Sequence, residues 1–221
     1  SFPDTLVIQN KYQTKQELPF IPGSEVAGVV KVVGAGVEDW KPGDRVSAPA
    51  LNGGYAEEVV ADASRLLAVP DQMDFASAAV LGSAYGTSYY GLTERGQLRA
   101  GETLMVLGAS GGDGLAADEI GKALGAKVIA CASSAERLAV CRAHGADETI
   151  DYVADDMRAR VKAITKGNGI DVVYDPVGGP YSELALRDMA WGGRFLVVGF
   201  AAGEIPKIPL NLPLIKGCSI V

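Results

Sequence analysis

The sequence predicts an α/β protein in which a doubly wound, parallel sheet follows a smaller β-rich module. Up to about residue 80, short β-branched runs alternate with Gly, Pro and Asp turn signals, which is typical of short strands. From about residue 82, strand-like runs alternate with helical segments, which is the pattern of stacked βαβ units. We therefore expect two domains, residues 1–81 and 82–221.

The β-rich module has three expected strands, at residues 25–34 (EVAGVVKVVG), 44–50 (DRVSAPA) and 56–61 (AEEVVA). The opening segment SFPDTLVIQ also has a strand-like pattern. Trp40 to Val46 predict a tight turn into the second run, because Pro42 fixes one backbone angle and Gly43 permits unusual ones. Together these features predict a small barrel-like module.

The second domain has six expected strands, at residues 103–108, 127–132, 148–152, 171–176, 193–199 and 217–221. Helices are expected between them, one ending at Leu124 and others at residues 135–144, 155–165 and 181–190. Right-handed crossovers are nearly obligatory in such units, so a doubly wound sheet follows. The last run, GCSIV, is apolar and is expected at the sheet edge, where it predicts a homodimer that pairs two such edges.

Composition excludes several classes of function. The formal net charge is -7, and the 20 Lys and Arg residues are scattered, so no basic stripe predicts nucleic-acid binding. No apolar run reaches the roughly 18 residues that suggest a membrane span, and no signal-peptide pattern opens the chain. We expect a cytoplasmic protein. The chain begins without Met and ends in an apolar run, so we also expect that both ends are cut.

Metal chemistry is not expected either. Cys131, Cys141 and Cys218 lie far apart without a C-x-x-C pair, and we expect them to be reduced and buried. The one histidine, His144, lies in a helix-ending turn (AHGAD), where a partly exposed turn residue is expected rather than a catalytic one. This set of residues cannot assemble an ordinary tetrahedral zinc site.

A glycine-rich turn, ASGGDG at residues 109–114, carries the main functional signal. It is G-x-G-x-x-G with Ala in the first position, and it lies after a strand and before a helix. Gly111 would let the backbone approach a pyrophosphate, and Gly114 would let the helix pack against the sheet. Free N–H groups of the first helical turn would then meet the phosphates. The alternative is a plain strand-to-helix turn.

The end of the second strand selects the dinucleotide. An NAD-type site carries Asp or Glu there, whereas this chain has Ser133 and Ser134, and its acid Glu136 lies two residues inside the helix. Two hydroxyls and Arg137 can bind a 2'-phosphate, so NADPH is favoured over NADH. The alternative is an ordinary serine N-cap beside a surface arginine.

A set of motifs across the chain resembles the zinc-independent quinone oxidoreductases, including zeta-crystallin, of the medium-chain dehydrogenase/reductase superfamily. The motifs occur in the family's order and spacing: PGSEVAGVV, KPGDRV, GGYAEEVV, YGTSYYGL, GETLMVLGASGGDGLAA, KALGAKVIACASS, GADETIDY, DVVYDPVGG and GGRFLVVGFAAGEIP. The resemblance implies a GroES-like catalytic domain, here incomplete, and a Rossmann domain that binds NADPH. Zinc-binding relatives have a histidine where Ser24 stands, which agrees with the absence of a metal site.

The resemblance also implies which residues meet the cofactor. They follow the carboxyl ends of the strands, where an open α/β sheet binds its ligand. The set is Thr87, Gly111, Gly112, Asp113, Gly114, Ser133, Ser134, Arg137, Tyr152, Val177, Gly199, Phe200, Ala201 and Ala202. Some have other interpretations: Tyr152 as a packing aromatic, Thr87 as the N-cap of a helix that begins near Ser88, and residues 199–203 as a plain turn.

The implied reaction is hydride transfer to a small-molecule quinone or to an α,β-unsaturated carbonyl, with no obligatory side-chain nucleophile. Tyr55 and Asp4 fall where the resemblance places the substrate cleft, although Tyr55 could instead be a core or rim residue. The family's chain continues past GCSIV to close the catalytic domain.

Three acids depart from the family pattern, which usually has Val, Val and Gln at Asp113, Asp118 and Glu119. Asp113 is expected to repel the pyrophosphate, and Asp118 is expected to point toward the sheet and take up a proton. A non-catalytic NADPH-binding or structural protein, as crystallin-type relatives illustrate, is therefore the alternative function.

Overall fold

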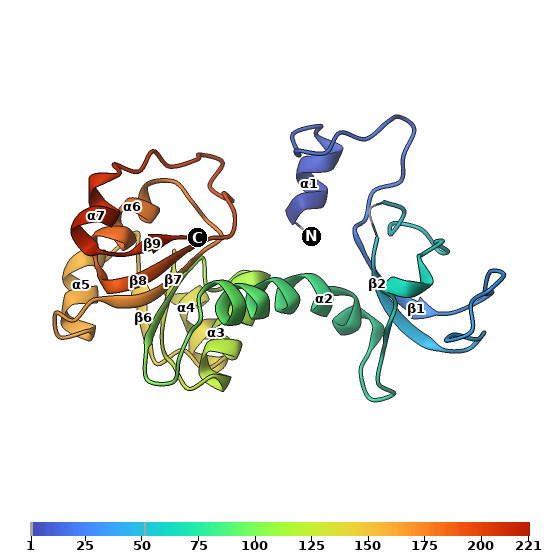
Figure 1. The fold of residues 1–221 in the computed structure, drawn as a ribbon, viewed down its shortest axis with the longest axis horizontal. Helices are drawn as coiled ribbons and strands as arrows, with labels where there is room; N and C mark the ends of the chain where they lie inside the picture. The colour runs from blue at the N-terminus through green and yellow to red at the C-terminus, as the bar shows by residue number, and fades with distance from the viewer. Residues whose placement is uncertain (1, 51) are drawn as a thin grey trace. The chain divides into compact units, whose positions relative to one another are not determined.

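The computed structural model describes residues 2–50 and 52–221 (Figure 1). The chain forms two compact units, Ser1–Gly86 and Thr87–Val221. The expected domain boundary, between residues 81 and 82, lies inside helix α2 (Phe75–Tyr90) and stays a prediction. No helix of residues 2–50 and 52–221 has the length and apolarity to cross a bilayer.

The first unit contains a three-stranded antiparallel sheet in the order β1-β2-β3, not the expected barrel. Its strands are β1 (Glu25–Val29), β2 (Arg45–Pro49) and β3 (Leu67–Ala68), and a short 3-10 helix, η1 (Ala63–Arg65), precedes β3. Glu25 pairs with Pro49, and Val46 pairs with Ala68. The turn predicted at Trp40 to Val46 leads into β2 through Gly43, whose φ of 98° is the left-handed region that favours glycine.

Two expected strands of this unit are wrong. The opening segment forms a helix, α1 (Phe2–Ile8), in which Pro3 lies in the first turn, where its missing N–H costs nothing. Residues 56–61 form no strand, because all six are exposed and Val60 is 99% exposed. A strand needs a half-buried face, and this run has none.

The second unit contains a six-stranded sheet in the order β6-β5-β4-β7-β8-β9, all parallel. The strands are β4 (Thr103–Leu107), β5 (Lys127–Ala132), β6 (Glu148–Asp151), β7 (Ile170–Asp175), β8 (Met189–Val197) and β9 (Ser219–Ile220). The six expected strands and the edge position of GCSIV are confirmed. This is the strand order of a doubly wound Rossmann sheet.

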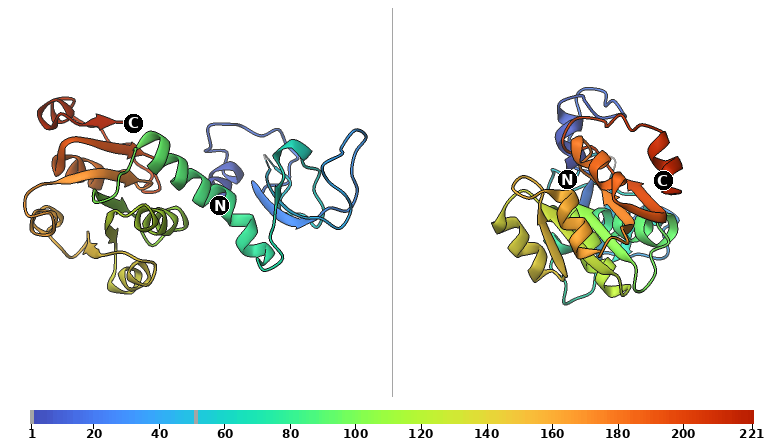
Figure 2. Two further views of the ribbon diagram at one scale, coloured as in Figure 1. Left: turned by 60° about the horizontal axis from the view of Figure 1, so that its bottom comes forward. Right: turned by 90° about the vertical axis from the view of Figure 1, so that its left-hand side faces the viewer.

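Helices cover both faces of this sheet (Figures 1 and 2). They are η2 (a π-helix, Gly91–Arg95), α3 (Gly112–Ala123), α4 (Ala135–Ala143), α5 (Met157–Ile164), α6 (Pro180–Arg187) and α7 (Asn211–Lys216). Helices α5, α6 and α7 contribute to one apolar core, whereas η2, α3 and α4 contribute to the other. The helix expected at residues 181–190 ends three residues early, since Met189 is buried and begins β8.

Candidate functional site

The carboxyl ends of the parallel strands of the second unit all lie at the same end of the sheet. The chain leaves β4 toward β5 and β6, and later returns to the other side of β4 to form β7, β8 and β9. The strand order therefore reverses between β4 and β7. Open α/β sheets bind their ligands at such a switch point, beyond the carboxyl ends of the strands.

The glycine-rich turn lies at this switch point, between β4 and α3. Gly108 follows β4 with a φ of 62°, and a Cβ there would lie 2.6 Å from Cγ2 of Val177 in the loop after β7. A Cβ on Gly114 would lie 2.5 Å from the carbonyl oxygen of Gly108. Ala109 is fully buried, and its N–H donates to the carbonyl of Cys131 at 3.0 Å. The turn is thus closely packed against β5 and the β7 loop.

The outer side of the same turn is open. Gly111 and Gly112 are exposed, and a Cβ on Gly112 would meet no atom within 4 Å. Gly111 is the N-cap of α3, so the first N–H groups of the helix have no acceptor in a preceding turn. These groups lie at the positive end of the helix dipole. The turn therefore offers backbone donors and free space to a phosphate.

Asp113 lies in the first turn of α3 and is half-buried. Burial raises the pKa of its carboxyl group. Its backbone carbonyl accepts a hydrogen bond of 3.0 Å from the hydroxyl of Ser88, which lies 2.9 Å from the Tyr174 hydroxyl. Burial raises the pKa of Tyr174 to about 12, and the Asp113 charge adds to that shift while the hydrogen bond to Ser88 opposes it. The charge of Asp113 thus affects the hydroxyl group of Tyr174 on β7.

Thr87 precedes Ser88 in α2 and is exposed. Because α2 begins at Phe75, the alternative that Thr87 caps a helix starting near Ser88 is wrong. Ser88 is fully buried and ties this part of α2 to the glycine turn.

Serine and arginine side chains gather at the end of β5. Ser134 is the N-cap of α4 and accepts from the backbone N–H of Arg137 at 3.3 Å. Nη1 of Arg137 donates to the hydroxyl of Ser133 at 3.1 Å. Burial raises the pKa of Tyr152, and both Ser133 and Arg137 oppose that shift, so all three lie within interaction distance. The capping interpretation holds for Ser134 and leaves Ser133, Arg137 and Tyr152 as a polar cluster.

Tyr152 also packs on an aromatic neighbour. Its ring centroid lies 4.3 Å from that of Tyr181, with the ring planes tilted by 33°. The packing interpretation of Tyr152 therefore applies to its ring, while its hydroxyl interacts with Ser133.

The loop after β7 is held by an acid that the sequence analysis missed. Oδ1 of the buried Asp175 accepts from the backbone N–H groups of Val177 at 2.8 Å and Gly178 at 2.9 Å, and Oδ2 accepts from the hydroxyl of Ser182 at 2.5 Å. The segment DPVGGPYS could have predicted this role of Asp175, because Asp often accepts hydrogen bonds from backbone N–H groups two or three residues onward.

The loop after β8 attaches to the loop after β7. Val198 and Gly199 donate their N–H groups to the carbonyl of Asp175 at 2.9 and 3.2 Å. Ala201 donates to Pro176 at 3.0 Å, and Ala202 donates to Val177 at 2.9 Å. A Cβ on Gly178 would lie 2.9 Å from Cδ1 of Phe200. Residues 199–202 are thus held by backbone hydrogen bonds beside Val177 at the switch point.

Tyr55 and Asp4, the two substrate-cleft candidates, belong to the first unit. Tyr55 is 63% exposed, so it is not a core tyrosine, and its N–H donates to the carbonyl of Pro22 at 2.9 Å. Asp4 is buried in α1.

The described ranges 2–50 and 52–221 hold no group of three or more His, Cys, Asp or Glu that could bind a metal ion. All three cysteines are free, and Cys131 and Cys141 are buried as expected, whereas Cys218 is only partly buried. Nδ1 of His144 lies 2.6 Å from Oε1 of Glu119, so His144 is a partly exposed residue that joins the end of α4 to α3.

Asp118 points into the protein, as expected. It is fully buried, and neither of its carboxyl oxygens has a hydrogen-bond partner within the described residues. Burial, and then the neighbouring charge of Glu119, raise its pKa to about 8. Asp118 is thus mostly protonated at neutral pH, and it adds to the raised pKa values of Cys131 and Cys141.

Comparison with known proteins gives two matched families. Residues 112–221 match the zinc-binding dehydrogenase family, and residues 2–71 match the alcohol dehydrogenase GroES-like domain. The chain is 43% identical to a Nematostella vectensis protein named quinone oxidoreductase-like protein 2 homolog, over 100% of this chain and 61% of that protein. The chain thus spans about three fifths of the length of this relative.

Two solved structures are similar over 100% of the chain. A probable oxidoreductase from Mycobacterium abscessus is 41% identical, with a TM-score of 0.87, and 66% of its chain is covered. The Escherichia coli quinone oxidoreductase complexed with NADPH is 31% identical, with a TM-score of 0.92, and 68% of its chain is covered.

Proposed function

This chain belongs to the medium-chain dehydrogenase/reductase superfamily, and from that premise we propose that it is part of an NADPH-dependent oxidoreductase that reduces a quinone or an α,β-unsaturated carbonyl. The observation that favours NADPH is the cluster of Ser133 and Arg137 after β5 with Tyr152 after β6. A guanidinium group and two hydroxyl groups suit a 2'-phosphate, and no acid ends β5.

The glycine turn and its neighbouring loops would hold the rest of the cofactor. Backbone N–H groups of Gly112, Asp113 and Gly114 fit the pyrophosphate, because the turn is open on its outer side. The N–H of Gly111 already donates to the carbonyl of Gly108 at 3.0 Å, so Gly111 would border the phosphates without donating to them. Val177 and the loop formed by Gly199, Phe200, Ala201 and Ala202 would border the nicotinamide half, and Thr87 would contribute from α2. Asp175 positions this region by fixing the N–H groups of Val177 and Gly178.

Bound NADPH would supply a hydride, and the chain's own residues would orient it and keep water away. The proposal includes no metal ion, and Ser24 stands where zinc-binding relatives have a ligand. Tyr55 and Asp4 are proposed to belong to the substrate-binding part of the protein. Neither is needed as a nucleophile.

Titration with NADPH, followed by its fluorescence, tests the binding step, and addition of 1,4-benzoquinone or an enone tests turnover. We expect saturable NADPH binding below millimolar concentration and oxidation of NADPH by at least one acceptor. Failure to bind either NADPH or NADH in that range contradicts the proposal.

A second candidate is a non-catalytic NADPH-binding or structural protein. The half-buried Asp113 beside the phosphate turn favours it, since a carboxylate there opposes tight binding. Thermal stabilisation by NADPH without turnover of any quinone or enone would support this candidate, and rapid turnover would exclude it.

We also propose a homodimer formed through β9. This strand pairs with β8 on one side and ends the sheet on the other, and its Ile220 is 41% exposed. An open strand edge invites pairing with a second copy. Light scattering at micromolar concentration should give twice the chain mass, and the mass of one chain would contradict this proposal.

A further inference from the structure

A cavity lies near the amino ends of strands β7 and β8, away from the cofactor residues at the carboxyl ends of the strands. Its volume is about 350 Å³, and it lies beside the start of β8 and the loop that precedes β7. Its walls come from α5, from residues 165–169, from Asp188 and Met189, and from Lys216 at the end of α7. The cofactor residues follow the carboxyl ends of the strands, so the two sites do not share residues.

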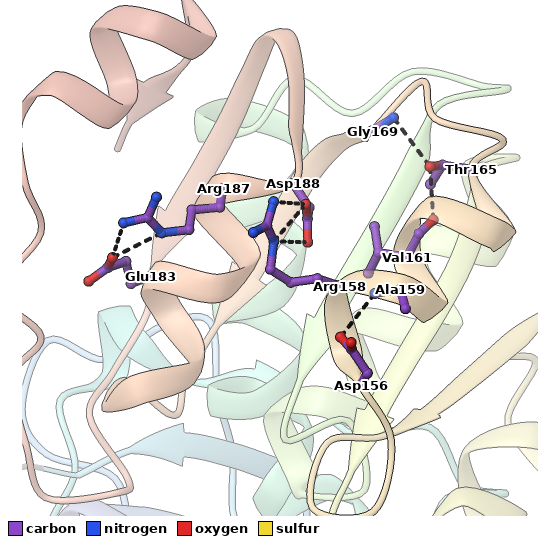
Figure 3. A network of polar contacts seen from close by, with 9 residues as sticks. All are labelled: Asp156, Arg158, Ala159, Val161, Thr165, Gly169, Glu183, Arg187 and Asp188. Carbon is purple, nitrogen blue, oxygen red and sulfur yellow. Dashed lines mark hydrogen bonds and ion pairs between the residues drawn. The ribbon is translucent and has the colours of Figure 1, made fainter.

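Three cations and one carboxylate line this cavity: Arg158, Lys162, Lys216 and Asp188. Arg158 reaches from α5 to Asp188 at the junction of α6 and β8, with nitrogen to oxygen distances of 3.3–3.4 Å (Figure 3). Within residues 2–50 and 52–221, the side-chain ammonium groups of Lys162 and Lys216 make no hydrogen bond or ion pair. The cavity thus has an excess of positive charge in a chain whose net charge is -7.

The other charges near the cavity already have partners. Asp156 is the N-cap of α5 and accepts from the N–H of Ala159 at 3.1 Å. Arg187 and Glu183 pair with one another on α6 at 2.6 Å, away from Arg158 (Figure 3). Burial raises the pKa of Asp188, and the charges of Arg158 and Lys216 oppose that shift, so both cations act on the same carboxylate.

The backbone N–H groups of residues 166–169 all donate to acceptors within this region. The Thr165 hydroxyl donates to the carbonyl of Val161 at 2.8 Å and accepts from the N–H of Gly169 at 3.3 Å (Figure 3). The N–H of Gly167 donates to Lys162 at 3.0 Å, and the N–H of Asn168 donates to Thr165 at 3.0 Å. A ligand here would therefore be recognised by side chains: two ammonium groups, the outer edge of a guanidinium group and the Asn168 amide.

We propose that this cavity binds a small phosphate ester. Two ammonium groups that form no ion pair within the described residues suit a phosphate dianion, since the ammonium group is a common phosphate ligand. The volume exceeds that of a bare phosphate ion and falls in the range of small-molecule pockets, which leaves room for an organic group. The Asp188 carboxylate would then accept a hydrogen bond from a hydroxyl group of that organic part, and the Asn168 amide would donate one to such a group.

The test is a nuclear magnetic resonance titration of the ¹⁵N-labelled chain with glycerol phosphate and inorganic phosphate, compared with sodium chloride of equal ionic strength. The amides of Gly167, Asn168, Gly169 and Gly217 report this cavity, and those of Gly112 and Gly114 report the glycine turn separately. We expect saturable shifts at the cavity amides at roughly millimolar glycerol phosphate, and weaker binding of inorganic phosphate.

The double variant Lys162→Ala/Lys216→Ala should weaken this binding about tenfold or more, since each removed charge is worth several-fold. Lys41→Ala/Lys207→Ala removes the same charge from exposed positions outside the cavity and should leave the affinity unchanged. Shifts that never saturate, that sodium chloride reproduces, or that both double variants reduce equally would overturn the proposal. Shifts confined to Gly112 and Gly114 would overturn it too, without affecting the proposed cofactor site.

Discussion

The hydroxyl oxygens of Ser88 on α2 and Tyr174 on β7 lie 2.9 Å apart, and both residues are fully buried. Because Ser88 donates its one proton to the carbonyl of Asp113, Tyr174 must donate to Ser88. This chain of hydrogen bonds joins α2, the first turn of α3 and the end of β7. Tyr174 is followed in sequence by Asp175, whose carboxylate holds the loop after β7.

Ser88→Ala should destabilise the chain by about 1–3 kcal/mol, because it leaves a buried tyrosine hydroxyl without an acceptor. Tyr174→Phe should cost less, since Ser88 can still donate to Asp113. Urea unfolding of the single variants and the double variant Ser88→Ala/Tyr174→Phe measures the coupling. We expect the double variant to lose less stability than the sum of the two single losses, and simple additivity would contradict the network.

Two glycines of the same turn should respond oppositely to alanine. Gly114→Ala places a Cβ 2.5 Å from the Gly108 carbonyl oxygen and should lower the melting temperature by several degrees. Gly112→Ala meets no atom within 4 Å and should keep or slightly raise stability, since alanine favours the helix. It should nevertheless weaken NADPH binding by crowding the phosphate. Equal melting temperatures for the two variants would contradict the packing described.

Asp118 makes stability depend on pH. Its pKa of about 8 in the folded protein lies above the ordinary value of 3.8, so the folded state binds more protons between these two pH values. The stability that comes from the protonated Asp118 is therefore fully present below about pH 4. As the pH rises toward 8, the free energy of unfolding falls by up to about 1.4 kcal/mol per pH unit. Asp118→Asn should remove this slope.

Urea unfolding between pH 4 and pH 9 measures how the free energy of unfolding depends on pH in the unmodified chain and in Asp118→Asn. Asp71→Asn, which removes an exposed acid, is the control, and its curve should stay parallel to that of the unmodified chain. Asp118→Val should raise stability most at the alkaline end. If the Asp118→Asn curve also stays parallel to that of the unmodified chain, the buried carboxyl group does not titrate as described.

Asp113→Val should tighten NADPH binding about two- to fivefold at neutral pH, because a carboxylate in the first turn of α3 opposes the pyrophosphate. Its raised pKa adds a pH dependence. As the pH falls, Asp113 takes up a proton and the advantage of the variant should shrink. Fluorescence titrations at acidic and neutral pH measure this, and an affinity ratio of one at both would show that the carboxylate does not act on the phosphates.

The Rossmann sheet could be predicted because its signals are local and repeated. Most strands contain a short apolar run, as Thr103–Leu107 does, and several helices begin or end at a residue with a known preference, such as Ser134. The first unit was harder to predict. Residues 56–61 include the β-branched Val59 and Val60, yet no neighbouring element buries them, and only tertiary structure decides that.

The polar contacts of the site were only partly predictable. The glycine turn lies between β4 and α3 as its motif predicts, whereas the roles of its residues and of Ser133 in binding a cofactor stay predictions. Ser88, Tyr174 and Asp175 were missed because their partners lie on distant segments or because their side chains serve a backbone loop. Asp118 was expected to point toward the sheet at a position where the family usually has Val, whereas its lack of a hydrogen-bond partner among the described residues follows only from the structure.

The dissociation constants of NADPH and NADH for the unmodified chain and for Arg137→Ala test the central claim most directly. We predict that NADPH binds at least about tenfold more tightly than NADH, and that Arg137→Ala weakens NADPH about tenfold while changing NADH by less than about twofold. Arg160→Ala, which removes an exposed arginine elsewhere, should change neither. Equal affinity of the unmodified chain for NADPH and NADH, or equal loss of both in Arg137→Ala, would contradict the account.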